Sequence, residues 1–317
     1  MDITIVTESM AELLLIMMAG FILARCGMLD EHTDRQLSSI IAQTTSPLLI
    51  LSTALQSPSG NNSLVLLLVL CGFLLYGVLI VFARMLVHLL PVRKEDRPVY
   101  ECMLVFSNCI FMGFPVLQSL LGDEAVFYCS MLHMPLNVYL YTYAVSMMQK
   151  AAAMEKGEAV VKKGFRSTLR SIITPGFLIT LLALVLFLCN VRDDGFVYET
   201  VHMIGNVTSP LSMMLLGSSF ARSPVMDSLK DRRAYGYSLL RLFVIPLASL
   251  GVCRLAGVSS YFTIITVLTL GMPCAAIILV FGNIYLKDPS LISRCIVVST
   301  LLSILSIPVL VAVLNMV

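Results

Sequence analysis

Apolar residues follow one another along this chain in long windows, which short stretches of charged residues, glycine or proline interrupt. A helix that crosses a bilayer needs about 20 predominantly apolar residues. The windows that approach this length are residues 9–26, 37–56, 64–87, 99–121, 124–148, 171–190, 197–220, 234–256, 260–285 and 290–315. The pattern therefore predicts an all-α integral membrane protein with ten transmembrane helices.

Composition agrees with this prediction. The chain has 317 residues, of which 58% are hydrophobic and only 13% are charged. Soluble domains carry about 25% charged residues, so this chain lacks the charge that coats a water-facing surface. The net charge of +2 is too small to indicate nucleic-acid binding. The lipid bilayer is the expected environment, and nucleic acid is not an expected partner.

The positive charges alternate from loop to loop. The loops after the first, third, fifth, seventh and ninth predicted spans, with their flanking residues, hold most of the Lys and Arg residues. These are Arg25, Arg35, Arg84, Arg93, Lys94, Arg97, Lys150, Lys156, Lys162, Lys163, Arg166, Arg170, Arg222, Lys230, Arg232, Arg233, Lys287 and Arg294. Because Lys and Arg accumulate in cytoplasmic loops, we expect a multi-pass plasma-membrane protein with both termini extracytoplasmic.

The chain divides into two similar halves. Its longest polar segment is a predicted cytoplasmic linker at 149–170, which separates a five-helix repeat at 1–148 from a second at 171–317. Three motifs recur at corresponding positions of the two halves. They are Thr45–Leu48 with Thr208–Leu211, Gly113–Pro115 with Gly271–Pro273, and Cys26 with Cys189. Because five spans is an odd number, the second repeat must be inverted, as in many secondary transporters.

The repeated Gly-x-Pro motifs lie in the middle of the fourth and ninth spans. Proline removes a backbone donor, and glycine allows the chain to leave helical geometry. One such proline would indicate a simple kink, but its duplication predicts two broken helices that cross. The second half-helices would begin near Pro115 and Pro273, with their positive ends at the membrane midplane. Neither span carries a deep Asp or Glu, so this site would favour an anion, most simply a carboxylate.

Here the sequence resembles a known family. Asn108–Pro115, which reads NCIFMGFP, is similar to the span-four crossover of the auxin efflux carrier family. Pro273–Pro308, with Leu279–Tyr285 inside it, resembles the ninth and tenth spans of that family, and Ser46–Leu49 resembles its span-two proline motif. The resemblance covers nearly the whole chain, and its compact form is similar to the prokaryotic branch.

The resemblance implies an inverted repeat with a scaffold and a transport unit, which carries small organic anions by an elevator-type motion. Asn108 would then contact the substrate carboxylate. The candidate substrate-binding residues are Ser46, Asn108, Met112, Gly113, Pro115, His133, Gly271 and Pro273. The linker is short and span three lacks the Asp and Lys of the plant support site, so malate-like and malonate-like acids are expected rather than auxin. A homodimer is an expected assembly.

Several polar residues allow two interpretations. Asn108 would either bind substrate or bond to a neighbouring helix, and His133 would either pack in the core or carry a proton. Ser46 and Ser209 would cap local breaks or line the site. Arg241 would either snorkel to the cytoplasmic surface or contact the anion. We expect snorkelling, and hence anion selectivity from helix ends rather than from a buried cation.

Other functions fit the sequence less well. A membrane-embedded enzyme would need acidic or metal-binding clusters within the spans, whereas the adjacent acids lie in loops. The nine cysteines form no CxxC pair, so we expect small buried residues, and we expect no metal and no cofactor. A channel and a ligand sensor that reuses a transporter fold remain as alternatives.

The charge alternation generates a topological prediction. Thr4 and Val317 should both be extracytoplasmic, and the 149–170 linker should be cytoplasmic. Single cysteines introduced at these sites into a cysteine-free variant should react accordingly with a membrane-impermeant thiol reagent. Termini on opposite faces would contradict both the ten-span count and the inverted repeat.

Overall fold

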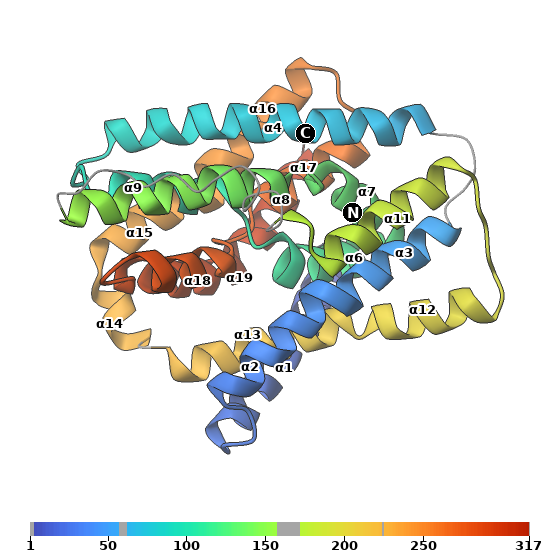
Figure 1. Cartoon of the computed structure of the whole chain (residues 1–317), viewed down its shortest axis with the longest axis horizontal. Helices are drawn as coiled ribbons and strands as arrows, with labels where there is room; N and C mark the ends of the chain where they lie inside the picture. The colour runs from blue at the N-terminus through green and yellow to red at the C-terminus, as the bar shows by residue number, and fades with distance from the viewer. Residues whose placement is uncertain (1–2, 57–61, 157–171, 224, 317) are drawn as a thin grey trace.

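The computed structural model describes residues 3–56, 62–156, 172–223 and 225–316, and these residues form helices without any strand (Figure 1). In the first half the helices are α1 (Ile3–Arg25), α2 (Glu31–Ile40), η1 (Ile41–Thr45), α3 (Ser46–Gln56), α4 (Asn62–Leu89), α5 (Arg97–Val105), η2 (Cys109–Gly113), α6 (Phe114–Leu121), α7 (Asp123–His133), α8 (Leu136–Tyr139), η3 (Leu140–Ala144) and α9 (Val145–Lys156). In the second half they are α11 (Pro175–Leu188), α12 (Phe196–Asn206), α13 (Thr208–Arg222), α14 (Val225–Lys230), α15 (Arg232–Leu239), η4 (Leu240–Val244), α16 (Ile245–Leu255), α17 (Ser260–Leu270), α18 (Ala276–Tyr285) and α19 (Ser290–Met316). The prediction of an all-α protein is confirmed.

Among the described residues, four continuous helices are long and apolar enough to cross a membrane. They are Glu31–Gln56, Asn62–Leu89, Arg232–Leu255 and Ser290–Met316. The fourth and ninth predicted spans are instead each divided into two shorter helices. Many large apolar side chains face outward, and on α4 the exposed fractions of Leu67, Leu70 and Leu74 are 54%, 66% and 68%. Such a surface is stable in contact with lipid rather than water.

Three of the helical segments contain a π-turn that ends close to a proline. The π-turns η1, η2 and η4 each end two residues before a proline, namely Pro47, Pro115 and Pro246. In each, the amide of the residue before the proline donates to the carbonyl five residues earlier, as from Ser46 to Ile41. Proline has no N–H for the normal bond and its ring crowds the preceding turn, so the wider turn relieves the clash.

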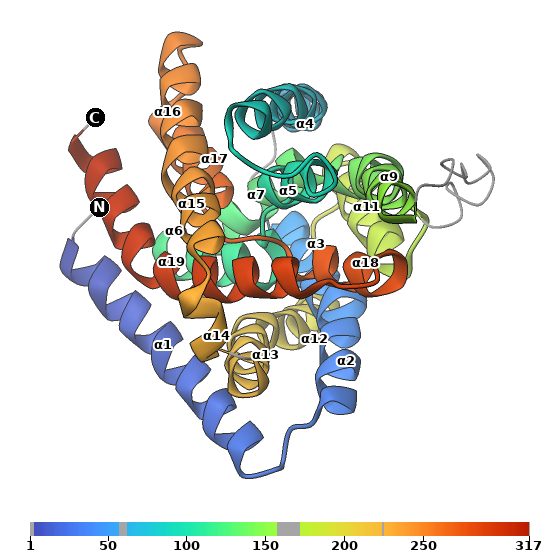
Figure 2. The same cartoon turned by 90° about the vertical axis from the view of Figure 1, so that its left-hand side faces the viewer.

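The helices pack as two groups. In the first helix group (α1–α3 and α11–α13) α1 lies along α13, and α3 packs on α11 and α12. The second helix group comprises α4–α9 and α15–α19, in which α4 packs on α5 and α7, and α15 on α19. In Figure 2, α16 runs upright and α19 crosses the view from the left, while α4 is seen nearly end-on. The two groups meet where α1 touches α6 and α19, where α13 touches α6 and η2, and where α3 touches α7.

The first helix group depends on glycines that let backbones approach closely. A Cβ atom on Gly217 of α13 would lie 1.8 Å from the carbonyl oxygen of Met17, and one on Gly20 of α1 would lie 2.0 Å from that of Met214. A real side chain has no room at either position, so the two glycines fix the α1–α13 contact from both sides. Small residues serve the same purpose at helix interfaces in membranes generally.

The first and sixth predicted spans end in the same way. After α1, the amide of Met28 donates to Leu23 and Gly27 has a positive φ of 77°. After α11, the amide of Val191 donates to Leu186 and Asn190 has a positive φ of 54°. Both ends are Schellman caps, and they immediately follow the corresponding residues Cys26 and Cys189. The local structure thus supports the internal repeat at this pair of positions.

The repeated Thr-Ser-Pro-Leu motifs, by contrast, adopt different structures. In the first half Thr45 ends a π-turn within a continuous helix, whereas Thr208 begins α13 after a break at Val207. The predicted linker also differs from its expected form. Its residues 149–156 continue α9, and residues 157–170 lie outside the described part of the chain.

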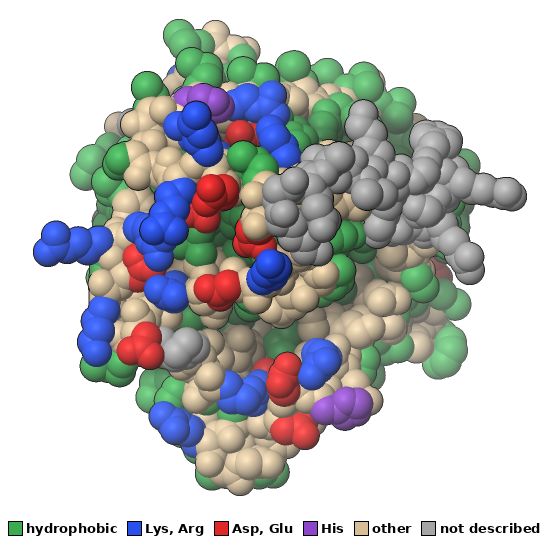
Figure 3. Space-filling view, turned by 60° about the vertical axis from the view of Figure 1, so that its left-hand side comes forward, with side chains coloured by type: hydrophobic (Ala, Val, Ile, Leu, Met, Phe, Trp, Pro, Cys, Tyr) green, Lys and Arg blue, Asp and Glu red, His purple; other side chains and the backbone are tan. Residues whose placement is uncertain are grey.

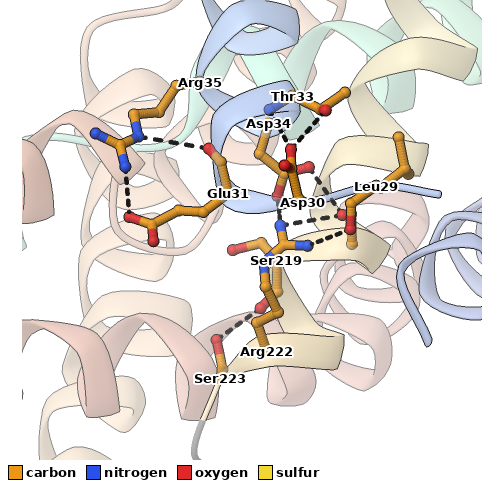
Figure 4. Close-up of polar contacts among 10 residues, drawn as sticks. Leu29, Asp30, Glu31, Thr33, Asp34, Arg35, Ser219, Arg222 and Ser223 are labelled. Atoms are coloured by element: carbon orange, nitrogen blue, oxygen red, sulfur yellow. Dashed lines mark hydrogen bonds and ion pairs between the residues drawn. The ribbon is translucent and has the colours of Figure 1, made fainter. Parts of the chain in front are cut away.

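Charged side chains gather on one face of the molecule (Figure 3). Arg222 of α13 donates to the carboxylate of Asp34 and to the carbonyl of Leu29, the latter at 2.9 Å (Figure 4). Ser218 also donates to Asp34, at 2.8 Å. Asp231 similarly accepts from Arg294 of α19 at 3.0 Å. Burial raises the pKa of Asp231, but hydrogen bonds from Arg233 and the charges of both arginines outweigh it and lower that pKa below its ordinary value.

The close α1–α13 contact generates a stability prediction. Gly217→Ala should lower the thermal unfolding midpoint of the purified protein, because the added methyl group meets backbone atoms. Gly251→Ala is the matched control, since a Cβ atom on Gly251 of α16 would have nothing within 4 Å, and alanine is the better helix former. Equal midpoints for the two variants would show that the contact is looser than described.

Candidate functional site

The two broken helices meet in the interior. Between α5 and η2 the chain is non-helical at Phe106–Asn108, and between α17 and α18 it is non-helical at Gly271–Ala275. The amide of Asn108 donates to the carbonyl of Pro273 at 2.8 Å, and the amide of Ala275 donates to that of Phe106 at 3.0 Å. Ser107 and Cys274 thereby form an isolated antiparallel bridge. Each break supplies the hydrogen-bond partners that the other has lost.

The two prolines occupy different places in this crossover. Pro273 lies within its break, where the sequence analysis places the break, and its carbonyl accepts from the amide of Asn108. Pro115 lies in the first turn of α6, and the break of its span begins earlier, at Phe106. The expectation that the second half-helix begins near Pro115 is therefore wrong. It begins with the π-turn at Cys109, because the wide turn accommodates the proline without ending the helix.

The glycines of the motif do not adopt unusual backbone angles. Gly113 has helical angles (φ −63°, ψ −47°), and Gly271 has φ −81° and ψ −2°. The expectation that they matter for their conformational freedom is wrong. Gly271 is instead required by the limited space around it, because a Cβ atom there would lie 2.5 Å from the Leu310 side chain. A Cβ atom on Gly113 would make only ordinary contacts, with the Cys109 sulfur at 3.5 Å and the Met272 side chain at 3.7 Å.

Arg241 lies directly against the crossover. Its side chain is completely buried in η4, so the expectation that it snorkels to the surface is wrong. Its Nε donates to the carbonyl of Met272 at 2.9 Å, and its Nη1 donates to the carbonyl of Leu104. These carbonyls lie at the carboxyl ends of α17 and α5, where helix dipoles are negative. The guanidinium therefore caps both of the helices that enter the crossover.

The charge of Arg241 is not neutralised within the described structure. No described carboxylate lies within 4 Å of it, and its Nη2 atom is buried without a hydrogen-bond partner. A buried charge is stable only when other charges and dipoles compensate it. The two carbonyls supply part of that compensation. A buried cation thus contributes positive potential at the site, contrary to the expectation that helix ends act alone.

The sequence matches a known protein family. A family model described as "Membrane transport protein" matches residues 5–311. The chain belongs to this family. The match confirms the resemblance to the auxin efflux carriers and shows a transport protein rather than an enzyme.

Two archaeal relatives are similar over almost their whole length. An uncharacterized transporter of Methanothermobacter thermautotrophicus is 25% identical over 306 residues, covering 95% of this chain and 96% of the relative. An uncharacterized transporter of Methanocaldococcus jannaschii is 24% identical over 305 residues, covering 93% and 94%. The similarity therefore extends across both halves of this membrane transport protein.

The structure brings most of the candidate residues of span four to the crossover. Asn108 is 4% exposed and precedes η2 with φ −77° and ψ 63°, and its side chain does not cap the turn. Its carbonyl accepts from the amides of Met112 and Gly113 at 3.3 and 3.1 Å. The sulfur of Met112 accepts from Ser303 of α19 at 3.7 Å. Asn108 thus lies beside Pro273, and its side-chain amide makes no capping hydrogen bond to the turn that follows.

His133 connects α7 to the end of α17. Its Nδ1 lies 2.7 Å from the Tyr76 hydroxyl, and its Nε2 lies 3.0 Å from the Thr269 hydroxyl. Thr269 donates its own proton to the carbonyl of Ile265 at 2.7 Å, so it accepts from Nε2–H. The neutral ring then accepts from Tyr76 at Nδ1, an assignment inferred from the hydrogen-bond network. His133 thus contacts α17 at Thr269, two residues before Gly271, as expected of a histidine that packs in the core.

Cys109 and Cys129 lie beside His133, a grouping that the sequence analysis did not anticipate. One potential ligand atom from each residue lies within 4.8 Å of the others, and the two sulfurs are 3.7 Å apart. Soft donors of this kind suit copper(I) or zinc, although both imidazole nitrogens already have partners. The available signal was the four-residue spacing of Cys129 and His133, which places them on one face of a helix.

The Ser residues of the repeated motif lie near the boundary between the helix groups. Ser46 is buried at the start of α3, and the Ser209 hydroxyl donates to Gln118 of α6. Sequence reasoning did not identify a further set of buried hydroxyl groups. Buried Ser and Thr hydroxyls without a hydrogen-bond partner in the described structure belong to Thr45, Ser107, Thr208, Ser212 and Ser306. Such groups require water or a ligand, and they come from both helix groups.

The position of Arg241 generates a prediction. Arg241→Met should lower the free energy of unfolding by about 2–6 kcal/mol, since two buried carbonyls lose donors at about 1–3 kcal/mol each. The matched control is Arg254→Met, because Arg254 is exposed on α16. Denaturation in a fixed detergent would measure both variants. If Arg241→Met is as stable as Arg254→Met, the capping role is refuted.

Proposed function

We propose that this membrane transport protein is a secondary transporter of small organic anions, with carboxylates as the substrate class. The observation that carries the proposal is the meeting of two broken helices against the buried, uncompensated Arg241. Substrate binds at this crossover, between the second helix group and the hydroxyl groups of the first. The chain has ten spans in two inverted five-helix repeats.

The electrostatics of the crossover favour an anion. The amino-terminal ends of η2 and α18 start at the breaks and contribute positive potential there. Arg241 adds a full charge. No Asp or Glu occurs at residues 106–121 or 260–285, and Glu101 accepts from Tyr143 and Arg84 instead. A sodium or proton antiporter would use carboxylates at this place.

Two separately packed helix groups support an elevator-type motion. The first helix group is held together by the α1–α13 glycine contacts and the Arg222–Asp34 ion pair, so we assign it as the scaffold. The second helix group contains the crossover and Arg241, so we assign it as the moving unit. Unpartnered hydroxyls on both groups, such as those of Thr208 and Ser107, would exchange partners as the moving unit slides.

The expected orientation follows from the charges. The face on which Lys and Arg side chains gather in Figure 3 is assigned to the cytoplasm, because cytoplasmic loops accumulate these residues. The protein then lies in the plasma membrane with both termini outside.

Transport itself is tested in proteoliposomes. The purified protein should take up at least one member of a panel of radiolabelled mono- and dicarboxylates, with and without an imposed pH gradient. Binding without uptake would instead indicate a ligand sensor, and unit conductance in planar bilayers would indicate a channel. A panel that neither binds nor moves would refute the organic-anion assignment.

Asn108 provides the residue-level prediction. Asn108→Ala should weaken binding of the transported acid about 10- to 150-fold, because a hydrogen bond to a charged group contributes about 1.5–3 kcal/mol. Asn283→Ala is the control, since Asn283 is exposed near the carboxyl end of α18. Isothermal titration of the purified variants measures both affinities. Wild-type affinity in a folded Asn108→Ala variant would mean that Asn108 only packs.

A further inference from the structure

A cationic cavity lies where the ends of α4, α5 and α9 come together, and none of the crossover residues lines it. It has a volume of about 190 Å³, and its lining includes His88, Lys94, Arg97, Glu101, Lys150 and Met154. A water molecule occupies about 30 Å³ in the liquid, so the cavity can hold a phosphate-sized group together with water. Nothing in the transport mechanism uses this cavity.

The cavity has an excess of positive charge. Its carboxylate, Glu101, is already engaged, since the Tyr143 hydroxyl donates to it at 2.6 Å and Arg84 lies 3.4 Å away. Lys94, Arg97 and Lys150 have no carboxylate within 4 Å in the described part of the chain. Three cations therefore surround a space without an anion to balance them.

One of these cations has an unsatisfied donor. The Nε atom of Arg97 is buried and lacks a hydrogen-bond partner among the described residues. Buried polar atoms in native proteins are nearly always paired, so an exception indicates a missing water, ion or ligand. Arginine and lysine together are typical partners of phosphate oxygens. The chemistry of the cavity thus fits a phosphate group.

An apolar groove runs along α4 towards the same cavity. The groove has a volume of about 480 Å³ and is lined by Phe73, Leu74, Gly77, Val78, Val81, Phe82 and Met85. Phe73, Gly77, Val81 and Met85 repeat every four residues and His88 follows, so groove and cavity share one face of α4. From Phe73 to Met85 the helix rises about 18 Å, which is close to one leaflet of a hydrocarbon core about 30 Å thick.

We propose that an anionic phospholipid binds along this face of α4. Its phosphate lies among Lys94, Arg97 and Lys150, and one acyl chain lies in the groove from Met85 to Phe73. A soluble phosphate compound would use the cavity but would leave the groove unexplained. The cationic residues Lys94, Arg97 and Lys150 belong to the loops assigned to the cytoplasm, where anionic lipids attract basic residues.

The lipid would bind only to the second helix group, since α4, α5 and α9 all belong to it. Helix α5 begins at Arg97 in the cavity and ends at Val105, immediately before the crossover. Occupancy of the cavity is therefore expected to stabilise the helix that leads into the candidate substrate site.

The test compares lipids of identical acyl chains on the full-length protein in a neutral detergent. Phosphatidylglycerol should bind and raise the thermal midpoint, as followed by native mass spectrometry and thermal unfolding, whereas phosphatidylcholine should do so far less. Lys94→Gln combined with Lys150→Gln should weaken phosphatidylglycerol binding about 30-fold, at about fivefold for each cation removed. Lys230→Gln combined with Lys287→Gln removes the same charge from exposed positions outside the cavity and should change binding less than twofold.

A separate arm distinguishes a lipid from a soluble phosphate. Gly77→Leu fills the groove and should weaken phosphatidylglycerol binding, while leaving any weak binding of soluble glycerol phosphate unchanged. Equal binding of the two lipids, or an unchanged affinity in the Lys94/Lys150 variant, would overturn the proposal. Glycerol phosphate that binds as tightly as the lipid would also overturn it, because the groove would then contribute nothing.

Discussion

The exchange of backbone hydrogen bonds between two interrupted helices is the constraint on which this structure depends. In a bilayer interior there is no water to replace a lost helical bond, so non-helical backbone is tolerated only where protein supplies the partners. Phe106–Asn108 and Gly271–Ala275 solve this problem together, since each accepts and donates across the Ser107–Cys274 bridge. Neither break would be stable without the other. The two halves of the chain must therefore come together for either half to be complete.

Arg241 donates hydrogen bonds to two carbonyl groups that the bridge leaves without a donor. The bridge uses the carbonyls of Phe106 and Pro273, but the carbonyls of Leu104 and Met272 at the ends of α5 and α17 need another donor. A guanidinium has five N–H groups in a fixed plane, so one side chain can reach both. Its remaining unpartnered nitrogen and uncompensated charge connect this structural role with the proposed transport of organic anions.

The structure around the crossover combines close backbone contacts with buried polar groups that lack hydrogen-bond partners. The α1–α13 contact is fixed by glycines that fit against opposing backbone, and such close contacts leave little freedom to slide. Buried hydroxyls on both helix groups, such as those of Thr208 and Ser306, lack partners in the described structure. The proposed movement of one group against the other, with a polar substrate between them, would give such hydroxyls partners, whereas a permanent interface would already satisfy them.

The sequence by itself determined the helical membrane class, the family and the two spans that break. Long apolar windows, alternating loop charge and the repeated Gly-x-Pro motif are local or periodic signals, so they can be recognised without a fold. Only the tertiary structure decided where the first break begins, because the π-turn at Cys109 absorbs Pro115 and moves the break to Phe106. The burial of Arg241 and the grouping of Cys109, Cys129 and His133 were likewise decided by tertiary contacts. Arg241 contacts residues more than 30 and more than 130 positions away, and no local pattern encodes which distant carbonyls a side chain will meet.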